Sequence, residues 1–288
     1  MSDSPGLPAH AAGWVRSVVG AGWRIRGVRP LEASSSTVLA VELGRGSARQ
    51  CLVLRLHDQA WFLEEGASAL AREAAALSVA AAAGLPAPRL VAWSNRRPAA
   101  LLMTTLPGAP ELLIPDPGAV RDVLERIHAL PTASLAEWSY RAYHEGITVT
   151  RPSWWRDAAT WERVARLAGA PPDIAEPVVI HRDFHPGNLL WVEGRLGGVV
   201  DWVEACVGPA AIDVSHMRVN LAVLHGPVVA DGVIAGDPAW DLEAALGFLD
   251  WSPPGAVDGW AGPWPHLPAD VARARLEAFV SGALARLR

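Results

Sequence analysis

Apolar and polar positions follow two different spacings along the chain, and each spacing predicts its own secondary structure. Residues 37–43 and 50–57 are short runs rich in apolar and β-branched side chains, and the stretch 44–47 between them contains two glycines. This pattern is typical of two strands joined in a β-hairpin. Over residues 64–83, leucine and alanine instead recur at helical spacing, and Gly84 ends the pattern. A helix is therefore expected after the hairpin.

A second change of spacing occurs near residue 105. Before it, residues 89–93 and 99–103 predict two more strands, so the first hundred residues are expected to hold strands and one helix. Prolines and glycines then interrupt the pattern. Helices are expected over residues 116–130, 154–167, 241–250 and 269–287. The chain is therefore predicted to be α+β, with a small β-rich lobe at residues 1–104 and a larger, mainly helical lobe at residues 105–288.

Composition and charge narrow the class of protein. Of the 288 residues, 51% are hydrophobic and 19% are charged, which is enough apolar material for a folded core. The formal net charge of −5 disfavours a nucleic-acid partner, because such a protein needs a basic face. Cys51 and Cys206 are too few for a disulfide framework, and no leader pattern or apolar run of about 20 residues indicates export or a membrane partner. We therefore expect a soluble, cytoplasmic protein.

The basic residues are all of one kind. All 25 are arginine, and the sequence contains no lysine. This excludes chemistry that depends on a lysine amine, such as Schiff-base formation, attachment of pyridoxal phosphate and the lysine of a phosphate-binding P-loop. At any position where a related protein uses lysine, this chain must use another residue, and arginine is the natural replacement.

Residues 178–202 hold the most informative set of polar side chains. Within this stretch, the apolar runs 189–192 and 196–200 flank a glycine-containing turn, which predicts a second hairpin. Asn188 begins the first strand and Asp201 closes the second, and such ends of an antiparallel pair lie side by side. An amide oxygen and a carboxylate oxygen placed in this way suit Mg²⁺.

Asp183 lies five residues before Asn188, in a loop bent by a Pro-Gly pair, where it could orient a hydroxyl nucleophile. Phosphoryl transfer needs this division of labour, because one carboxylate accepts the hydroxyl proton while metal ligands hold the triphosphate. Taken singly, Asp183, Asn188 and Asp201 are each more typical of turns and strand ends, but their order and spacing favour phosphoryl transfer. A zinc site at His181, Asp183 and His185 is the rival interpretation, and no further His or Cys falls at ligand spacing.

Three motifs in this region resemble those of a known family. His181, Asp183 and Asn188 fit the pattern His-x-Asp-x-x-x-x-Asn, Asp201 lies in an apolar-Asp-Trp context, and residues 208–214 echo Gly-Asp-Pro-x-x-Asp-Leu without its first Asp. The chain thus resembles the aminoglycoside phosphotransferase and choline kinase group of small-molecule kinases, distant relatives of protein kinases. The resemblance implies a bilobal, protein-kinase-like fold, ATP or GTP as phosphate donor and Mg²⁺ as cofactor. It also implies Asp183 as catalytic base and Asn188 and Asp201 as Mg²⁺ ligands.

The small lobe contains candidates for nucleotide binding. Arg55 lies mid-strand between apolar neighbours and needs a partner, for which Glu73 on the following helix is the natural choice. The two resemble the family's Lys–Glu pair that holds the α- and β-phosphates, with Arg in place of Lys. Ser35 and Ser36 lie in a segment that resembles the phosphate-covering loop but lacks glycine, and Met103 begins a segment that resembles the adenine-binding linker. The alternatives are a structural ion pair, an ordinary polar turn and a plain connector between lobes.

The C-terminal part suggests what accepts the phosphate. Between Arg218 and Arg273 there is no arginine or lysine. This stretch instead contains several acidic residues and tryptophans: Asp231, Asp237, Asp241, Glu243, Asp250, Asp258 and Asp270, with Trp240, Trp251, Trp260 and Trp264. Carboxylates attract ammonium groups, and tryptophan faces favour cations and sugar rings. We therefore expect a cationic or sugar-like hydroxyl acceptor such as an aminoglycoside, and hence a role in antibiotic resistance. The alternative is a solvated acidic surface with packing tryptophans and helix-capping acids.

Three functions compete at this stage. The first is an ATP- or GTP-dependent, Mg²⁺-dependent kinase that phosphorylates a small-molecule hydroxyl. The second is a nucleotide-binding pseudokinase or scaffold without turnover, which Arg55 and the loop without glycine would suit. The third is a protein kinase, but the dozen residues between Asp201 and Asp213 leave little room for an activation segment. The motif set favours the first.

Overall fold

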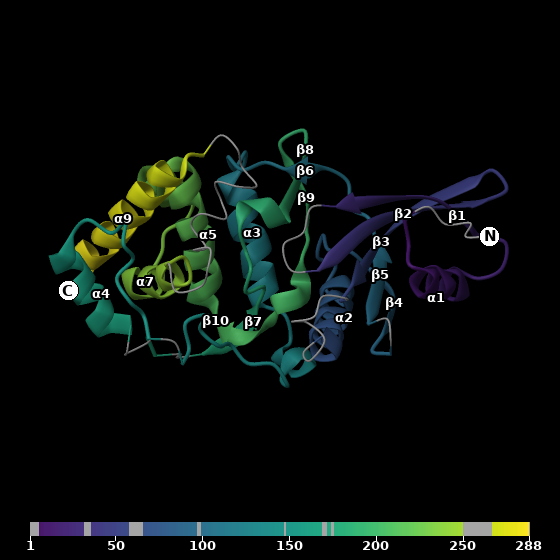
Figure 1. Cartoon of the computed structure of the whole chain (residues 1–288), viewed down its shortest axis with the longest axis horizontal. Helices are drawn as coiled ribbons and strands as arrows, with labels where there is room; N and C mark the ends of the chain where they lie inside the picture. Colours follow the sequence, from purple (N-terminus) through teal and green to yellow (C-terminus); the bar gives the residue numbers. More distant parts are fainter. Residues whose placement is uncertain are drawn as a thin grey trace. The chain divides into compact units, whose positions relative to one another are not determined.

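The structure is a computed structural model that describes residues 6–31, 36–57, 66–96, 99–146, 148–168, 172–173, 176–249 and 267–287 (Figure 1). The chain forms two compact units: Met1–Pro107 with Gly197–Glu204, and Gly108–Leu196 with Ala205–Arg288. The sequence predicted two lobes, each formed by one continuous stretch of chain: residues 1–104 and residues 105–288. The first unit instead includes a segment from the second half of the chain, and this segment carries Asp201.

A five-stranded antiparallel sheet with the order β1-β2-β3-β5-β4 forms the centre of the first unit. Its strands are β1 (Arg24–Leu31), β2 (Thr37–Arg45), β3 (Ala48–Leu56), β4 (Leu90–Ser94) and β5 (Ala100–Thr104). The predicted hairpin is present as β2 and β3, which pair as far as Arg45 and Ala48 and so leave a turn of two residues. The two further strands are also confirmed, whereas β1 had no counterpart in the sequence prediction.

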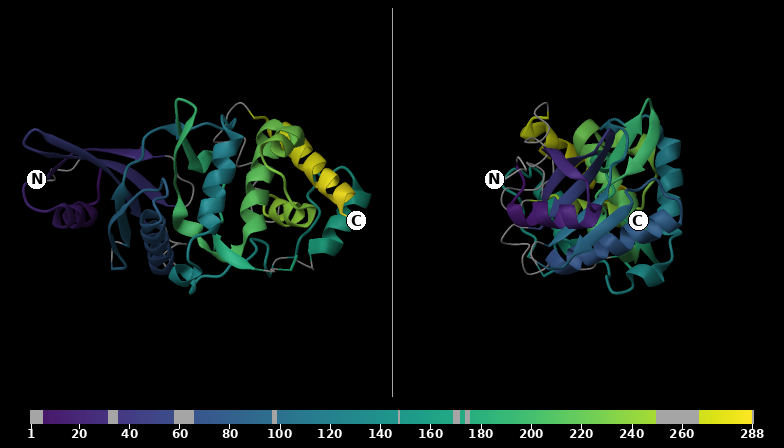
Figure 2. Two further views of the ribbon diagram at one scale, coloured as in Figure 1. Left: turned by 180° about the vertical axis from the view of Figure 1, so that it is seen from behind. Right: turned by 90° about the vertical axis from the view of Figure 1, so that its right-hand side faces the viewer.

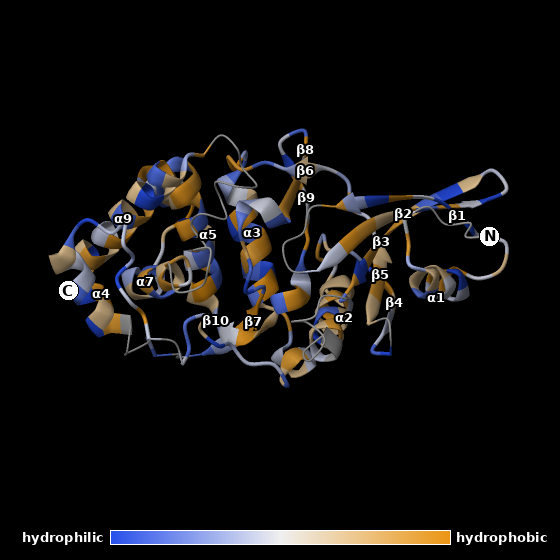
Figure 3. Cartoon of the chain, viewed as in Figure 1, coloured by the Kyte–Doolittle hydropathy of each residue, from blue (hydrophilic) through white to orange (hydrophobic). Residues whose placement is uncertain are grey.

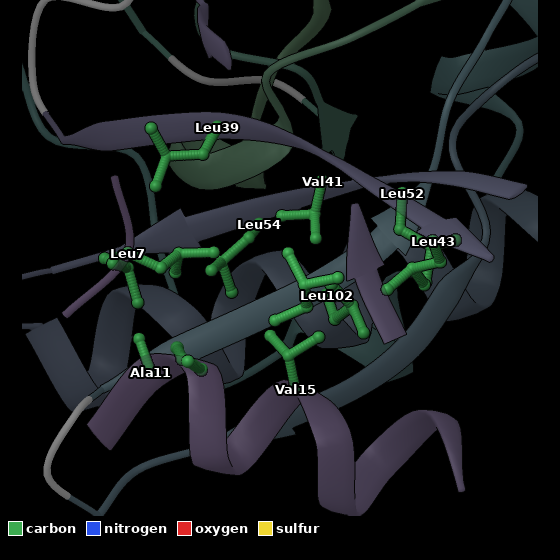
Figure 4. Packing of buried hydrophobic residues seen from close by; sticks show 13 residues of the cluster. Leu7, Ala11, Val15, Leu39, Val41, Leu43, Leu52, Leu54 and Leu102 are labelled. Atoms are coloured by element: carbon green, nitrogen blue, oxygen red, sulfur yellow. The ribbon is translucent and has the colours of Figure 1, made fainter. Parts of the chain in front are cut away.

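Two helices accompany this sheet, so the expectation of one helix in the first hundred residues was wrong. The predicted helix is α2 (Gly66–Ala82), and the additional one is α1 (Ala9–Val19). The buried side of α1 consists of small residues such as Ala11 and Val15, which give a weak apolar signal. In Figure 4 these side chains point toward the strands that carry Leu39 and Leu54. One core therefore joins α1 to β2 and β3.

Helices predominate in the second unit. They are α3 (Pro117–His128), α4 (Ala158–Ala168), α5 (Ala210–His225), α6 (Pro227–Val233), α7 (Pro238–Leu246) and α9 (Ala269–Arg286), with a 3₁₀ turn η2 (Thr132–Leu135). The expected helices correspond to α3, α4, α7 and α9, whereas α5 and α6 were not predicted. Helix α5 packs against α6, α7 and α9, and Figures 1 and 2 show it beside α9. None of the helices in the described ranges is both long and apolar enough to cross a bilayer.

Helix α3 shows how the local sequence sets an element of this unit. Asp116 caps its first turn, because the carboxylate accepts hydrogen bonds from the backbone N–H groups of Gly118 and Ala119. The apolar side chains Val120, Val123, Leu124 and Ile127 are all buried. Figure 3 shows the resulting alternation of orange and blue along the helix. The element therefore has both a start signal and a one-sided apolar face, which explains why the sequence predicts it.

Short strands position the loops of the candidate site. β7 (Pro177–Ile180) pairs antiparallel with β10 (Cys206–Pro209). β6 (Ala109–Pro110), β8 (Leu189–Val192) and β9 (Arg195–Val199) follow one another in a three-stranded sheet, which confirms the second predicted hairpin. Two 3₁₀ turns lie next to these strands: η3 (Pro186–Asn188) precedes β8, and η4 (Trp202–Glu204) follows β9 after two residues.

Candidate active site

The loop after β7 carries Asp183, and its backbone is held by Asp213. The two carboxylate oxygens of Asp213 accept hydrogen bonds from the backbone N–H groups of His181 (2.8 Å) and Arg182 (2.7 Å). Asp213 is fully buried in the first turn of α5, and Nε2 of His128 lies 3.2 Å from its Oδ2. Arg182 has a φ of 71°, a left-handed conformation that is rare for a residue with a Cβ. Asp213 therefore stabilises the unusual turn that presents Asp183.

The side chain of Arg182 anchors the same loop from another side. Its guanidinium lies 3.8 Å from the ring centroid of Tyr143 and 4.8 Å from that of Tyr140. It also donates a 3.2 Å hydrogen bond to the carbonyl of Arg141. Stacking of this kind stabilises a buried guanidinium. Arg182 thus fixes the loop rather than extending into solvent.

Asp183 and Asn188 are brought together within one loop. Nδ2 of Asn188 donates to Oδ2 of Asp183 (3.1 Å) and to the backbone carbonyl of Asp183 (2.8 Å). The amide oxygen of Asn188 therefore points away from Asp183, since the two amide atoms lie on opposite sides of the group. Asn188 belongs to η3, which His185 caps by accepting a hydrogen bond from Gly187 at Nδ1.

Two histidines complete the surroundings of the Asp183 carboxylate. Nε2 of His216, on α5, lies 3.1 Å from Oδ1, and Nε2 of His185 lies 3.6 Å from Oδ2. Burial alone would raise the pKa of Asp183, but the neighbouring His185 and the hydrogen bond from His216 hold the pKa well below its usual value. The side chain remains 29% exposed. Asp183 is therefore an ionised carboxylate with access to solvent.

In the first unit, Arg55 is the centre of a buried polar cluster. Its Nε lies 3.0 Å from Oε2 of Glu73, so the predicted ion pair is present. One terminal nitrogen donates to Oγ of Ser36 (2.8 Å), and the other donates to Oδ1 of Asp201 (2.7 Å). Arg55 is 3% exposed, whereas the side chain of Asp201 is 27% exposed. The cluster joins β3, α2 and the segment after β9 within one unit.

Within this cluster, the pKa of Glu73 departs from its usual value. Burial raises the pKa of Glu73 to about 7, although the neighbouring charge of Arg55 acts in the opposite direction. Asp201 has a φ of 65°, so it too is held in the left-handed region. Arg72, which precedes Glu73 in α2, donates to the carbonyl of Val203 and to Glu204, two and three residues after Asp201. Helix α2 thus fixes the segment that carries Asp201.

The remaining candidates for nucleotide binding differ in position. Ser36 contacts Arg55, as above, and Ser35 lies outside the described residues. Met103 is not in a connector: it is inside β5, opposite Val53 of β3 and Leu90 of β4, and it is 5% exposed. The expected connector therefore begins after Thr104. Asp201 belongs to the first unit, whereas Asp183 and Asn188 belong to the second, so the side-by-side placement of Asn188 and Asp201 stays a prediction.

The acidic C-terminal stretch has a structural explanation where it is described. Asp231 and Asp241 form ion pairs with Arg218, Asp241 also binds Arg286, Glu243 accepts from Tyr140 and lies near His144, and Asp237 caps α7. These carboxylates have partners within the protein, and Asp237 has the helix-capping role that the sequence offered as part of the alternative. Asp250, Asp258, Trp251, Trp260 and Trp264 lie outside the described residues.

The structure also distinguishes two copies of one sequence pattern. Residues 236–242 fit Gly-Asp-Pro-x-x-Asp-Leu in full, but their second acid, Asp241, pairs with Arg218 inside the helical unit. The looser copy at residues 208–214 supplies Asp213, which holds the backbone beside Asp183. Position in the fold, rather than the stricter match, therefore identifies the functional copy. In the part of the chain that the structure describes, no three His, Cys, Asp or Glu side chains are arranged to hold a metal ion.

Comparison with known proteins agrees with this geometry. The family model described as "Phosphotransferase enzyme family" matches residues 27–254, which is most of the chain. The chain belongs to the phosphotransferase enzyme family. This phosphotransferase is 30% identical over 226 residues to an aminoglycoside 3'-phosphotransferase of Escherichia coli, with 67% of this chain and 80% of that protein covered. The resemblance drawn from its motifs is thereby confirmed.

Solved structures show that the phosphotransferase also shares its fold with this family. A thermostable mutant of aminoglycoside phosphotransferase APH(4)-Ia, in ternary complex with AMP-PNP and hygromycin B, matches with a TM-score of 0.59 at 17% identity, covering 95% of this chain and 98% of that one. An aminoglycoside-3'-phosphotransferase of type VIII matches with a TM-score of 0.51 at 19% identity, covering 94% and 98%. The α+β, kinase-like fold class predicted from the sequence is confirmed, and the phosphotransferase is an enzyme of the small-molecule kinase type.

One residue in contact with Asp183 had no place in the sequence interpretation. His216 was not singled out, because a lone histidine in an apolar stretch carries no motif. The only available signal was its spacing of three residues from Asp213, which places both side chains on one face of a helix.

Proposed function

We propose that this chain transfers a phosphate from ATP or GTP, with Mg²⁺, to a hydroxyl of a cationic or sugar-like small molecule such as an aminoglycoside. The observation that carries the proposal is the hydrogen-bonded pair of Asp183 and Asn188 in a loop held by Asp213. Family membership supports the reaction class. The relative from Escherichia coli is named for aminoglycosides, and the APH(4)-Ia complex contains AMP-PNP and hygromycin B, which supports the donor and the acceptor class.

Asp183 would act on the acceptor hydroxyl. Its lowered pKa keeps the carboxylate ionised at neutral pH, so it can accept a hydrogen bond from the hydroxyl and then its proton. A carboxylate with so low a pKa is a weak base. This suits phosphoryl transfer, because the transition state is loose and demands orientation of the nucleophile more than early removal of its proton.

The oxygen donors of Asn188 and Asp201 fit Mg²⁺. The amide nitrogen of Asn188 is used by Asp183, which leaves the amide oxygen as the atom for a cation. Asp201 offers a partly exposed carboxylate, of which one oxygen accepts from Arg55. Amide and carboxylate oxygens are hard ligands of the kind that Mg²⁺ prefers. When bound, the ion would neutralise charge on the phosphate oxygens.

Arg55 would bind the donor's phosphates, with Glu73 setting its position from α2. Ser35 and Ser36 would contribute to the loop that covers the phosphates, and Met103 would line the nucleotide site from β5. Arginine can contact a phosphate through two parallel N–H groups, which a lysine amine cannot do. A cytoplasmic location would supply the nucleotide, and phosphorylation of an aminoglycoside would confer antibiotic resistance.

The proposal is tested by phosphate transfer from γ-labelled ATP and GTP to a panel of aminoglycosides and amino alcohols, with and without Mg²⁺. Asp183→Asn should lower the rate about 100- to 10,000-fold, because it removes the proton acceptor with little change of shape. The matched control is Asp116→Asn, since asparagine also caps a helix well and should keep full activity. Product formation that survives Asp183→Asn, or Mg²⁺-dependent nucleotide binding without turnover of any acceptor, would contradict the proposal.

A further inference from the structure

Helix α5 contacts the loop that carries Asp183 at two points. Asp213 binds the backbone N–H groups of His181 and Arg182, and His216 reaches the Asp183 carboxylate itself. Asp213 and His216 are three residues apart, so both side chains lie on one face of the helix. The same face of α5 therefore fixes the backbone of the loop and contacts its central side chain.

The contact between His216 and Asp183 has a defined chemical sense. Burial lowers the pKa of His216, although Asp183 acts in the opposite direction, so the ring is neutral and carries one N–H. An ionised carboxylate only accepts hydrogen bonds. Since Nε2 lies 3.1 Å from Oδ1 of Asp183, the N–H must be on Nε2. His216 is thus a donor to Asp183.

The other oxygen of Asp183 is held from a different element. Oδ2 accepts from Asn188, which belongs to η3, whereas Oδ1 accepts from His216 on α5. Two donors on separate elements fix both the position and the rotation of the carboxylate plane. The ring of His216 is itself confined, because it is 6% exposed and has the rings of Phe248 and Tyr143 near it, with centroids 5.9 and 6.5 Å away.

His185 does not provide the same support. Its Nε2 is 3.6 Å from Oδ2, beyond ordinary hydrogen-bond distance, and its Nδ1 is engaged in capping η3. His216 is therefore the histidine placed to orient the carboxylate.

We propose that His216 is a positioning residue for phosphate transfer: its Nε2–H holds Oδ1 of Asp183, so that the carboxylate meets the acceptor hydroxyl in one orientation. This inference rests on the proposed function, because it gives His216 a role through Asp183. No proton leaves His216 in this role, and no bond to it forms or breaks.

The test compares two substitutions at this position by steady-state kinetics of the full chain. His216→Leu removes the donor and should lower kcat about 10- to 100-fold, as expected when a reacting group loses its alignment. His216→Gln keeps an N–H at similar reach and should restore kcat to within about fivefold of the original. The KM for the nucleotide should stay within about twofold in both variants, because the nucleotide is not what His216 orients.

A double-variant cycle separates positioning from packing. If His216 acts through Asp183, then His216→Leu should cause no further loss of kcat when Asp183→Asn is already present. An equal loss in both backgrounds, or an equal loss from Leu and Gln, would show a packing role and overturn the proposal. Full activity of His216→Leu, with Asp183 still essential, would overturn this proposal alone. A dispensable Asp183 would overturn both this proposal and the proposed function.

A measurement on the unsubstituted chain covers the case in which a variant does not fold. Long-range ¹H–¹⁵N NMR correlations of the imidazole rings distinguish a proton on Nε2 from one on Nδ1. His216 should show the Nε2–H form. An Nδ1–H form would contradict donation to Asp183 and overturn the proposal.

Discussion

The side chain of Arg55 contacts three partners at once. A lysine at this position would have a single nitrogen with which to contact them. The guanidinium of Arg55 contacts Glu73, Asp201 and Ser36 through three different nitrogens. The positions of these partners therefore depend on the planar shape of the guanidinium as well as on its charge. Burial raises the pKa of one of these partners, Glu73, to about 7.

This raised pKa predicts a specific pH dependence of stability. Between the ordinary value of 4.5 and about 7, the folded protein holds one proton more at Glu73 than the unfolded chain does. The contribution of Glu73 is therefore fully present below pH 4.5 and is lost as the pH rises toward 7. Relative to Glu73→Gln, which does not titrate, the unfolding free energy of the original protein should fall by about 2–3 kcal/mol from pH 5 to pH 8. Urea unfolding at several pH values measures this difference.

The matched control is Glu145→Gln, which removes an exposed carboxylate paired with Arg141. The difference in unfolding free energy between this variant and the original protein, measured at the same pH values, gives the effect of losing a surface charge. A difference for Glu73→Gln that is flat, or that rises with pH, would mean that Glu73 is ionised throughout this range in the folded protein.

At the scale of elements, α2 fixes the segment after β9 through Arg72. Its side chain donates to the carbonyl of Val203 (2.5 Å) and to Glu204 (3.0 Å), and Ala69 packs against Val203. The ion pair with Glu204 is partly exposed and so contributes little, whereas the bond to the carbonyl directly holds the backbone after Asp201.

Arg72→Met should therefore raise the Mg²⁺ concentration for half-maximal activity by about 10-fold, since support of a metal-binding group typically has effects of this size. Glu204→Gln keeps an acceptor for Arg72 and should change this concentration by less than about twofold. Titration of activity with Mg²⁺ at saturating nucleotide measures both. Equal effects of the two variants would assign the role to the ion pair instead.

A buried ionic network joins the helices of the second unit. Arg218 on α5 is 2% exposed and contacts Asp241 on α7, Asp231 on α6 and the carbonyl of Ile234. Arg286 on α9 reaches Asp241 from another side. Removal of Arg218 would leave a fully buried carboxylate with less compensation.

Arg218→Met should lower the unfolding free energy by about 3–5 kcal/mol, the usual cost of breaking a buried ion pair on one side. Arg286→Met removes a cation from the same carboxylate, but its side chain is 41% exposed, so the expected loss is under about 1 kcal/mol. Denaturant unfolding of both variants provides the comparison. Similar losses would show that Asp241 depends on both arginines alike.

The elements differ in how far their sequences predict them. The β2–β3 hairpin and α3 were predictable, because each has an apolar run or face bounded by a turn or a cap. Helix α5 was not, since nearly every residue from Ile212 to Leu224 is buried and the helix has no polar face to give a period. The helix that carries Asp213 and His216 therefore had no periodic signal of its own.

The contacts of the candidate site also differ in how far local sequence patterns predict them. The contact of Asp183 with Asn188 spans five residues and lies within one loop, so it is local in the sequence. The contacts Arg55–Asp201 and His216–Asp183 span 146 and 33 residues. Such contacts depend on how elements pack, which local patterns do not encode. The family motifs identified Asp201, but they did not indicate that Arg55 would bind it.

At the scale of the whole molecule, ligand binding should stabilise the folded chain by mass action. ATP with Mg²⁺ at about 100 times the dissociation constant should add about 2.7 kcal/mol to the unfolding free energy and raise the Tm by several degrees. Asp201→Ala should abolish the part of this shift that requires Mg²⁺, because it removes one of the two proposed ligands. Thermal unfolding with ATP alone, Mg²⁺ alone and both together measures the two parts.

The reference for this experiment is the Tm of each protein without ligand, since Asp201→Ala also removes a partner of Arg55. A Mg²⁺-dependent shift that persists at full size in Asp201→Ala would exclude Asp201 as a ligand of the ion.

The arginine at position 55 also decides which labelling chemistry can detect this protein. Acyl-phosphate derivatives of nucleotides tag many kinases by forming an amide with the amine beside the bound phosphates. A guanidinium does not undergo that reaction, and no ε-amino group exists elsewhere in the chain to substitute for it. Surveys that count kinases by such tags will pass over this protein, whereas vicinal dicarbonyl reagents, which condense with guanidinium groups, have 25 targets to choose from.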